Sequence, residues 1–257
     1  PRGRRAGAGG LKTMSAARGA AVFLVTGAAG GLGRACVARL RERGARVIAW
    51  DRALADIPCG ATALSVASID VTDPGAIRAG VAQIEADCGR LDHVVHLAGI
   101  AGKGPLDTVS REDWQRVLDV NLTSAFLLAQ AVHAPLARTR GSLTLTSSTN
   151  AANGGSALSG PAYAVAKAGL VNLMRYLARE WAPEGIRVNC ISPGPIDTPM
   201  VSGRFDAVTR ERLAAAVPLG RIGEPREVAH AIDYLTSPSA AFVTGTVMNV
   251  SGGLVMD

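Results

Sequence analysis

The chain is poor in the residues that bind metals or form disulfides. Its four cysteines are Cys36, Cys59, Cys88 and Cys190. No two of them form a Cys-x-x-Cys pair, and we interpret them as small buried apolar residues in a reducing compartment. His93 and His96 are two of only four histidines, and on a strand their spacing places them on opposite faces. The sequence therefore predicts no metal site.

Long hydrophobic runs are also missing. Although 48% of the residues are hydrophobic, no uninterrupted apolar run approaches the roughly 20 residues that span a bilayer. The apolar segment nearest the N-terminus leads directly into a glycine-rich turn, so it is predicted as a strand and not as a signal sequence. We expect a cytoplasmic protein with no membrane partner.

Acidic residues are absent from the beginning of the chain. Residues 1–19 form an expected basic leader rich in Gly and Ala, which carries Arg2, Arg4, Arg5 and Lys12. Without these four, the net charge of +6 falls to 23 basic against 21 acidic residues, or +2. We therefore expect no nucleic-acid partner. The leader is open to three readings: sequence upstream of a start at Met14, an expression remnant, or a transit peptide.

The most informative segment is a glycine cluster, Thr26-Gly27-Ala28-Ala29-Gly30-Gly31-Leu32-Gly33. It follows an apolar run and opens into residues 34–40, which have helical apolar spacing. Between a strand and a helix, such glycines let the backbone approach a pyrophosphate, and the helix N-terminus supplies free N–H groups.

An acidic residue completes this dinucleotide pattern. The next strand-like run ends on Asp51, which lies 18 residues beyond Gly33. A carboxylate there would accept hydrogen bonds from the ribose hydroxyls of the adenosine half.

Apolar runs alternate with helical patterns over the rest of the chain. Strands are predicted near residues 21–26, 46–50, 63–69, 92–97, 142–147, 186–191 and 246–250. Helices are predicted at about 72–88, 110–137, 161–181 and 225–236, besides the one after the glycine turn. This alternation predicts one α/β domain over residues 20–257, a doubly wound parallel sheet with helices on both faces. Its ligand should lie at the carboxyl ends of the strands.

Tyr163 and Lys167 are the strongest acid/base candidates near these ends. They are four residues apart, so on a helix they share one face. An ammonium about 4 Å from a phenolate stabilises it by roughly 4 kcal/mol at an effective dielectric of 20, or up to about three pKa units before desolvation. We expect a tyrosine poised to exchange a proton with an alcohol or a ketone.

Taken together, these residues resemble the short-chain dehydrogenase/reductase superfamily over about residues 20–257. The motifs that carry the resemblance are Thr26-Gly27 through Gly33, Asp70-Val71, Leu97-Ala98-Gly99, Val120-Asn121-Leu122, Ser148, Tyr163-x-x-x-Lys167 and Pro193-Gly194. The resemblance implies a single-domain Rossmann fold with a seven-stranded parallel sheet.

It also implies a catalytic set of four residues. Tyr163 would be the general acid/base, and Lys167 would lower its pKa and hold the nicotinamide ribose. Ser148 would polarise the substrate carbonyl, and Asn121 would hold a water linking Lys167 to solvent. The implied cofactor-binding residues are Gly27, Gly30, Gly31, Leu32, Gly33, Asp51, Asp70, Val71, Leu97, Ala98, Gly99, Tyr163, Lys167, Pro193, Ile196 and Thr198.

Three positions depart from the family pattern. Ser148 lies 15 residues before Tyr163, where the family usually has 13, so we expect a loop that is two residues longer, with Ser147 as the fallback. His96 stands where the family usually has an asparagine that braces the sheet, so that hydrogen bond must come from His96 or be absent. Ser251 stands where an aspartate is common.

Asp51 favours NAD(H), because its carboxylate would repel the 2′-phosphate of NADP. NADP(H) stays open as an alternative, because Arg52 could bind a 2′-phosphate and Arg34 lies on the next helix. The leading hypothesis is an NAD-dependent oxidoreductase that interconverts a secondary alcohol and a ketone. The alternatives are an NADPH-dependent 3-oxoacyl-carrier-protein reductase and a non-catalytic dinucleotide sensor.

The substrate stays unassigned at this stage. Residues 200–219 should form a lid, and the arginines Arg204, Arg210 and Arg212 could meet an anionic substrate or remain solvated. Apolar positions on the 161–181 helix (Leu170, Leu173, Met174 and Leu177) suggest a subunit interface. We expect a homotetramer, with a dimer as the smaller possibility.

Overall fold

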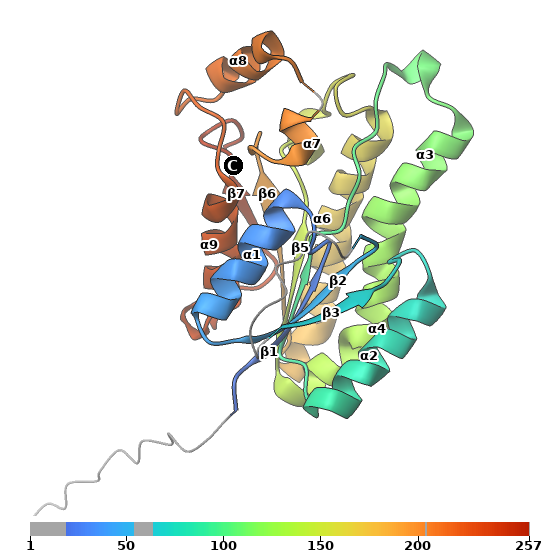
Figure 1. Cartoon of the computed structure of the whole chain (residues 1–257), viewed down its shortest axis with the longest axis vertical. Helices are drawn as coiled ribbons and strands as arrows, with labels where there is room; N and C mark the ends of the chain where they lie inside the picture. Colours follow the sequence, from blue (N-terminus) through green and yellow to red (C-terminus); the bar gives the residue numbers. More distant parts are fainter. Residues whose placement is uncertain (1–18, 54–63, 204, 257) are drawn as a thin grey trace, which may run out of the picture.

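The structure is a computed structural model that describes residues 19–53, 64–203 and 205–256. Within them, parallel strands form one seven-stranded sheet in the order β3-β2-β1-β4-β5-β6-β7 (Figure 1). The strands are β1 (Val22–Thr26), β2 (Arg46–Asp51), β3 (Leu64–Ser68), β4 (His93–His96), β5 (Ser142–Thr146), β6 (Arg187–Pro193) and β7 (Val247–Val250). The predicted fold class is confirmed.

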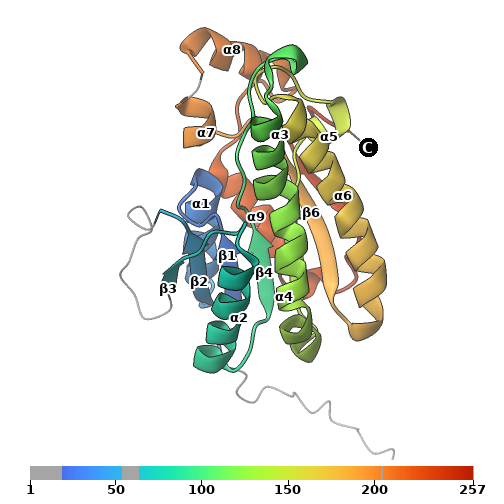
Figure 2. The ribbon, with the colours of Figure 1, turned by 90° about the vertical axis from the view of Figure 1, so that its right-hand side faces the viewer.

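Helices cover both faces of the sheet (Figure 2). On one face lie α2 (Pro74–Cys88), α4 (Ser124–Thr139) and α6 (Pro161–Trp181). On the other lie α1 (Gly31–Glu42) and α9 (Pro225–Leu235). Shorter elements are α3 (Arg111–Leu118), α5 (Asn150–Asn153), α7 (Pro199–Ser202), α8 (Ala207–Ala216), the 3-10 turns η1 (Leu106–Thr108), η3 (Ala182–Glu184) and η4 (Pro238–Ala240), and the π-helical turn η2 (Asp119–Thr123).

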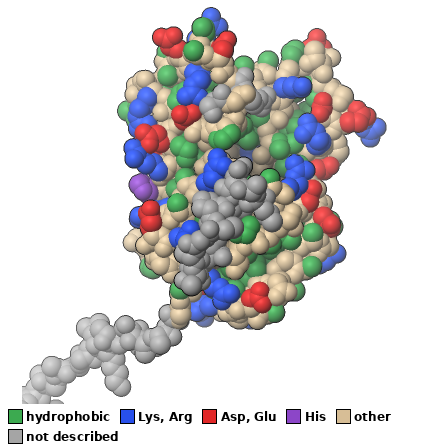
Figure 3. Space-filling view, viewed as in Figure 1, with side chains coloured by type: hydrophobic (Ala, Val, Ile, Leu, Met, Phe, Trp, Pro, Cys, Tyr) green, Lys and Arg blue, Asp and Glu red, His purple; other side chains and the backbone are tan. Residues whose placement is uncertain are grey.

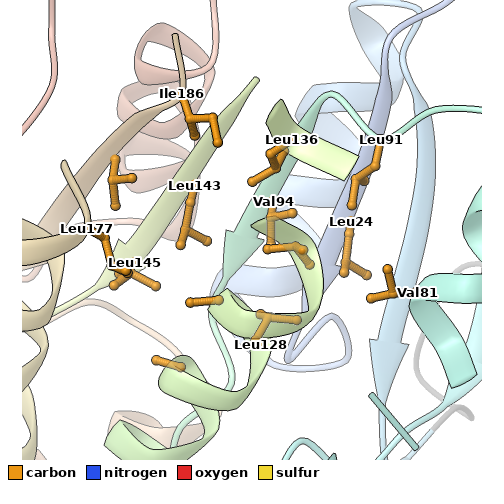
Figure 4. Packing of buried hydrophobic residues seen from close by; sticks show 14 of the residues in the cluster. Leu24, Val81, Leu91, Val94, Leu128, Leu136, Leu143, Leu145, Leu177 and Ile186 are labelled. Carbon is orange, nitrogen blue, oxygen red and sulfur yellow. The ribbon is translucent and has the colours of Figure 1, made fainter. Parts of the chain in front are cut away.

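The two faces of the sheet carry separate apolar cores, because successive strand residues point to opposite sides. Figure 4 shows the larger core, where Leu24, Val94 and Leu143 of the sheet pack near Leu128 and Leu136 of α4. Their side chains are fully buried. The neighbouring residues of β1 and β4, such as Phe23 and Val95, point to the α1 and α9 side.

Ion pairs join the two helices of that second face. Arg39 of α1 and Arg43, the C-cap of that helix, both bind the carboxylate of Asp233 on α9, with Arg39 Nη2 2.8 Å from Oδ2. On the face of the molecule seen in Figure 3, basic and acidic side chains are intermixed over the described residues. Arg39 and Arg43 thus fix the end of α1 against α9.

The order of the strands reverses beside β1. From β1 the chain moves outward to β2 and β3, and then returns to β4 on the other side of β1. Connections that diverge in this way leave a crevice at the carboxyl ends of β1 and β4. The glycine turn after β1 and the segment after β4 border that crevice, and α7 and α8 lie above it in Figure 1.

His96 braces the sheet at this reversal. Its Nδ1 lies 2.8 Å from Thr26 Oγ1, and its Nε2 lies 3.1 Å from Ser124 Oγ. Ser124 donates its own proton to Val120 O, so Nε2–H of His96 is the donor to Ser124, and Nδ1 accepts from Thr26. The expected hydrogen bond therefore does come from His96. His93 points to the opposite face, where it packs on Phe23.

The predicted long helix is continuous but not uniform. Residues 111–139 are helical, yet the π-helical turn η2 separates α3 from α4 and contains Asn121. By length and apolar composition alone this segment could cross a membrane. Its α4 portion instead packs on the sheet, with Leu128 and Val132 fully buried, which identifies it as a core helix.

One expectation about α6 is wrong. Leu170 and Met174 are fully buried, Leu177 is nearly so, and Leu173 is half-buried against the core. These side chains fill the sheet-facing core of the same chain because α6 lies directly over β5 and β6. The apolar residues of α6 that do reach the surface are others, among them Val165 and Tyr176.

The leader and Cys59 lie outside the described residues. Cys36 and Cys190 are buried as expected, and burial raises the pKa of each thiol to about 12. In the described part of the chain, no cluster of three or more His, Cys, Asp or Glu side chains could hold a metal ion.

The buried His96 makes stability depend on pH. Burial, and secondarily the charge of Lys167, lowers the pKa of His96 to about 3. Below pH 6.5 the unfolded chain therefore binds more protons at this histidine than the folded chain does. As a result, the free energy of unfolding falls as the pH decreases from 6.5 toward 3. We predict that wild type loses roughly 2 kcal/mol more than His96→Asn between pH 6.5 and 4.5. Urea unfolding at both pH values measures this.

The exposed His230 on α9 supplies the control. His230→Asn should keep the pH dependence of wild type. Equal pH dependence in wild type and His96→Asn would contradict the prediction.

Candidate active site

The turn after β1 requires glycine for steric reasons. Gly27 has a positive φ of 67°, and a Cβ there would lie 2.6 Å from the backbone N of Ala98. A Cβ on Gly33 would lie 2.1 Å from Gly27 O. The helix α1 therefore begins directly against the turn. Gly30 caps α1 without a side chain, so the first N–H groups of α1 stay available to an anion.

Asp51 ends β2 beside this turn. Its Oδ2 accepts the backbone N–H of Ala29 at 3.0 Å, and its Oδ1 accepts that of Ala53 at 3.2 Å. These bonds hold the half-buried carboxylate at the border of the glycine turn. The position fits the adenosine end of a dinucleotide whose pyrophosphate lies at the N-terminus of α1.

A second carboxylate lies near this end. Asp70 Oδ1 accepts hydrogen bonds from the backbone N–H and the hydroxyl of Thr72, and these bonds hold the pKa of Asp70 below its usual value. Arg52 Nη1 lies 3.7 Å from Asp70 Oδ2. Val71 is buried next to Asp70. The side chain of Arg52 therefore faces a carboxylate of its own chain.

The segment after β6 closes the opposite side of the crevice. A Cβ on Gly31 would lie 2.7 Å from Thr198 Cγ2, so the start of α1 and this segment meet directly. Ile196 is buried and pairs with Gly223 in an isolated bridge. Leu32, Gly99, Pro193, Ile196 and Thr198 all line one cavity. The structure thus brings these predicted cofactor residues together.

The same cavity contains the predicted acid/base group. Tyr163 is hydrogen-bonded to Ser148, whereas Ser147 is buried and donates its hydroxyl proton to Lys167 O at 2.9 Å. Of the two serines, it is therefore Ser148 that faces Tyr163.

Lys167 is buried, and its ammonium lies over the ring of Tyr163. Its Nζ donates to Thr146 O at 2.7 Å and lies 5.4 Å from the centroid of the Tyr163 ring. Burial lowers the pKa of Lys167 to about 8. Burial raises the pKa of Tyr163, against which the hydrogen bond from Ser148 acts.

This arrangement corrects the electrostatic argument made from the sequence. A lysine four residues away was expected to lower the pKa of Tyr163, but in this structure desolvation is the largest effect and acts in the opposite direction. The physical reason is that burial removes the Tyr163 hydroxyl from water and disfavours its charged form, while the Lys167 ammonium is held by the carbonyl of Thr146. The helical spacing predicts that Tyr163 and Lys167 share one face of the helix, but it cannot reveal that Thr146 O accepts from Lys167.

Asn121 approaches Lys167 from the π-helical turn. Its Nδ2 donates to Ile100 O at 2.8 Å and to Val117 O at 2.9 Å, while its buried Oδ1 has no hydrogen-bond partner. A Cβ on Gly99 would lie 2.7 Å from that Oδ1 and 3.4 Å from Lys167 Nζ. A buried acceptor and a buried ammonium therefore border the same small space, as a bridging water would require.

These residues surround a cavity of about 230 Å³. Its wall nearest Tyr163 is polar and includes Ser148, Asn150, Ser156 and Ser159. Apolar residues of the segment after β6, namely Met200, Val201, Phe205 and Leu213, also line the cavity, together with Leu254 from the segment after β7. A glycine cradle, an orphaned buried amide oxygen and a cavity beside a tyrosine fit a bound nicotinamide dinucleotide with a small substrate.

Sequence reasoning missed part of this cavity. Asn150, Ser156 and Ser159 were not predicted as site residues, although the extra length of their loop was a usable signal. Leu254 was missed as well. It comes from the segment after β7, which Gly252 brings against Val217, and nothing in its local sequence marks that contact.

The chain is similar to known dehydrogenases and reductases over nearly its whole length. A family model described as "Enoyl-(Acyl carrier protein) reductase" matches residues 27–255. The cis-4-hydroxycyclohexanecarboxylate dehydrogenase of Sinomonas cyclohexanicum is 41% identical over 243 residues, covering 90% of this chain and 95% of that protein. The 3-oxoacyl-[acyl-carrier-protein] reductase of Escherichia coli is 37% identical over 244 residues, covering 91% and 97%.

A solved structure agrees in fold. The 3-ketoacyl-(acyl-carrier-protein) reductase from Brucella melitensis, complexed with NADH, has a TM-score of 0.85 at 27% identity, and the match covers 92% of this chain and 98% of that one. The family model and this structure together support the same fold over nearly the whole chain.

Proposed function

Since the chain belongs to the short-chain dehydrogenase/reductase family of oxidoreductases, we propose that it interconverts a secondary alcohol and a ketone with NAD(H). The observation that carries the proposal is the group of Ser148, Tyr163 and Lys167 in one cavity, next to a glycine turn that fits a dinucleotide. That group can position a carbinol oxygen and exchange its proton.

The chain's residues manage the proton and the orientation of the substrate. In the oxidation, Tyr163 as phenolate takes the proton of the substrate hydroxyl, and Ser148 donates a hydrogen bond to the same oxygen. A nicotinamide dinucleotide held by the glycine turn would supply the acceptor for the hydride, which would leave the carbinol carbon with both electrons of its C–H bond. The ketone that remains keeps its oxygen against Ser148 and Tyr163, and reduction runs these steps in reverse.

Lys167 and Asn121 support the proton transfer from behind. The ammonium of Lys167 is held by Thr146 O and faces the orphaned Oδ1 of Asn121 across the space beside Gly99. A water in that space would carry the proton of Tyr163 toward solvent. Because burial lowers the pKa of Lys167 to about 8, this lysine can itself exchange a proton near neutral pH.

Asp51 supports NAD(H) over NADP(H). The carboxylate is fixed by two backbone N–H groups at the adenosine end, where it would accept from ribose hydroxyls and repel a 2′-phosphate. Arg52 is the residue that could reverse this preference, but Asp70 lies against it. Two carboxylates against one guanidinium leave this end of the crevice unfavourable for an added phosphate.

The second candidate is an NADPH-dependent 3-oxoacyl-carrier-protein reductase. The 37% identity to the Escherichia coli enzyme favours it, and Asp51 opposes it. A dinucleotide sensor without catalysis is a third candidate. It is opposed by the complete set of Ser148, Tyr163 and Lys167.

We also propose that the protein is a cytoplasmic homotetramer, or at least a dimer. Large apolar side chains are exposed along α4 and α6, where Phe126 is 47%, Val165 50% and Tyr176 64% exposed. Near the edge strand β7, Phe242 is fully exposed and Tyr234 of α9 is 41% exposed. Two such surfaces on different sides of one chain suit an assembly of more than two subunits.

The catalytic roles predict different effects at two neighbouring serines. Ser148→Ala should lower kcat by about 10²–10³-fold, because a donor to the developing oxyanion is lost. Ser147→Ala should leave kcat within about tenfold and cost about 1 kcal/mol of stability through the lost bond to Lys167 O. Initial rates of NADH formation and urea unfolding measure the two effects. A larger loss of kcat in Ser147→Ala would reverse the assignment.

Tyr163→Phe tests the proton transfer itself. Because the phenol is active in oxidation only when deprotonated and burial raises its pKa, alcohol oxidation by wild type should rise with pH above neutrality, while ketone reduction should fall. Tyr163→Phe should remove nearly all turnover and both pH trends. Residual activity that keeps the pH profile of wild type would contradict this role.

The cofactor preference is tested by exchanging the two dinucleotides. Wild type should use NAD⁺ with a kcat/KM at least about tenfold above that for NADP⁺, which corresponds to about 1.4 kcal/mol. Asp51→Ala should narrow this ratio by raising the kcat/KM for NADP⁺. Arg52→Ala should leave the ratio unchanged. A wild type that prefers NADP⁺ and loses that preference in Arg52→Ala would favour the reductase candidate.

The assembly is tested by sedimentation velocity. The wild-type chain should sediment as a tetramer, and Tyr176→Glu combined with Phe126→Glu should yield smaller species because charges would be buried at the α4/α6 surface. The exposed Val208 on α8 supplies the control variant Val208→Glu, which should not dissociate. A monomeric wild type would contradict the proposal.

A further inference from the structure

The loop between β5 and α6 adds a polar surface to the cavity beyond Ser148. Asn150, Ser156 and Ser159 all come from this loop and all line the cavity. None of them is needed for the proton transfer proposed above. We therefore expect a ligand with a polar group on the side that faces this loop.

Hydrogen bonds within the loop orient the amide of Asn150. Its Nδ2 donates to Ser159 Oγ at 2.7 Å, and Ser159 in turn donates to Ser156 O at 3.2 Å. Because the NH₂ end is held by Ser159, the carbonyl end of the amide is available as an acceptor. A half-buried acceptor of this kind recognises a neutral donor such as a hydroxyl group.

Asn150 is directly connected to the residue that polarises the reacting oxygen. The backbone N–H of Asn150 donates to Ser148 Oγ at 3.2 Å. Asn150, Ser148 and Tyr163 also line the same cavity, so a hydroxyl bound to the Asn150 side chain would share it with an oxygen held by Ser148 and Tyr163. A substrate with two oxygens on neighbouring carbon atoms would offer one to each partner.

The described cavity wall offers little to a charged substrate. Apart from Lys167, no Lys, Arg, Asp or Glu occurs among the described residues that line it. Arg210 of α8 pairs with Asp197 at 3.0 Å and is not part of that wall. The described lining also includes apolar residues such as Phe205 and Leu213. Against these side chains an anion would lose its hydration, and Lys167 is the only cationic side chain among the described lining residues.

Resting on the proposed function, we propose that the substrate is an uncharged vicinal diol, or the corresponding α-hydroxy ketone, and that Asn150 binds the hydroxyl that does not react. In the oxidation, one carbinol loses its hydride to the dinucleotide and its proton to Tyr163, and becomes the ketone. The neighbouring hydroxyl is unchanged and donates to Asn150. The hydrocarbon part of the substrate packs against the apolar wall.

The experiment compares matched alcohols with and without the second hydroxyl. The probes are cis-1,2-cyclohexanediol against cyclohexanol, and 2,3-butanediol against 2-butanol, with NAD⁺ and NADP⁺. For wild type, kcat/KM should be at least about tenfold higher for each diol than for its monoalcohol, since a site that bonds a hydroxyl discriminates against the analogue lacking it. Asn150→Leu should remove this ratio while retaining turnover of the monoalcohol.

Asn153 provides a matched control on the same short helix. It is exposed, does not line the cavity, and accepts the backbone N–H of Gly155. Asn153→Leu perturbs the loop without touching the cavity, so it should keep the diol preference. Since the readout is a ratio between two substrates, general damage to the enzyme cancels.

The outcomes separate this inference from the function on which it rests. Three outcomes would overturn the diol assignment alone. The first is turnover without a preference for diols, and the second is an equal preference in wild type and Asn150→Leu. The third is a higher kcat/KM for acetoacetyl-coenzyme A or for 4-hydroxycyclohexanecarboxylate than for the diols. NADH binding, followed by its fluorescence, without turnover of any diol also overturns it. Absence of dinucleotide binding overturns the proposed function itself.

Discussion

The close approach of backbone segments at the carboxyl ends of β1 and β4 is the constraint on which the site depends. Gly27 lies so near Ala98 that a Cβ would be 2.6 Å from the backbone nitrogen, and Gly33 lies equally tightly against Gly27. His96 fixes the same region by bonding Thr26 and Ser124. Because these contacts are rigid, the start of α1, the segment after β4 and the helix α4 share one fixed geometry.

Buried polar residues hold the neighbourhood of Tyr163 in place. Lys167 and Asn121 are both buried, and each uses backbone carbonyls as hydrogen-bond acceptors, Thr146 O for the lysine and Ile100 O and Val117 O for the asparagine. The π-helical turn allows Asn121 to reach into the space beside Gly99. The turn interrupts the regular helix and both side chains are desolvated, and in the proposed function these two residues would relay the proton of Tyr163.

Substrate recognition depends on parts of the chain with fewer constraints. The loop before α6 supplies the polar wall, and α7, α8 and the segment after β7 supply the apolar wall. Loops on a rigid scaffold can change length without disturbing the core. Relatives with similar sequences are named for activity on acyl carrier protein derivatives or on a hydroxycyclohexanecarboxylate.

The sequence by itself determined the order of strands and helices, the glycine turn, and the shared face of Tyr163 and Lys167, because these follow from local periodicity and steric rules. Only the tertiary structure decided that Ser148 and not Ser147 faces Tyr163, that Leu170 and Met174 fill the chain's own core, and that Thr146 O holds Lys167. Each of these depends on which distant segments meet. The role of Asn150 as a cavity residue belongs to the same group, since its partner Ser159 is brought to it by the fold of the longer loop.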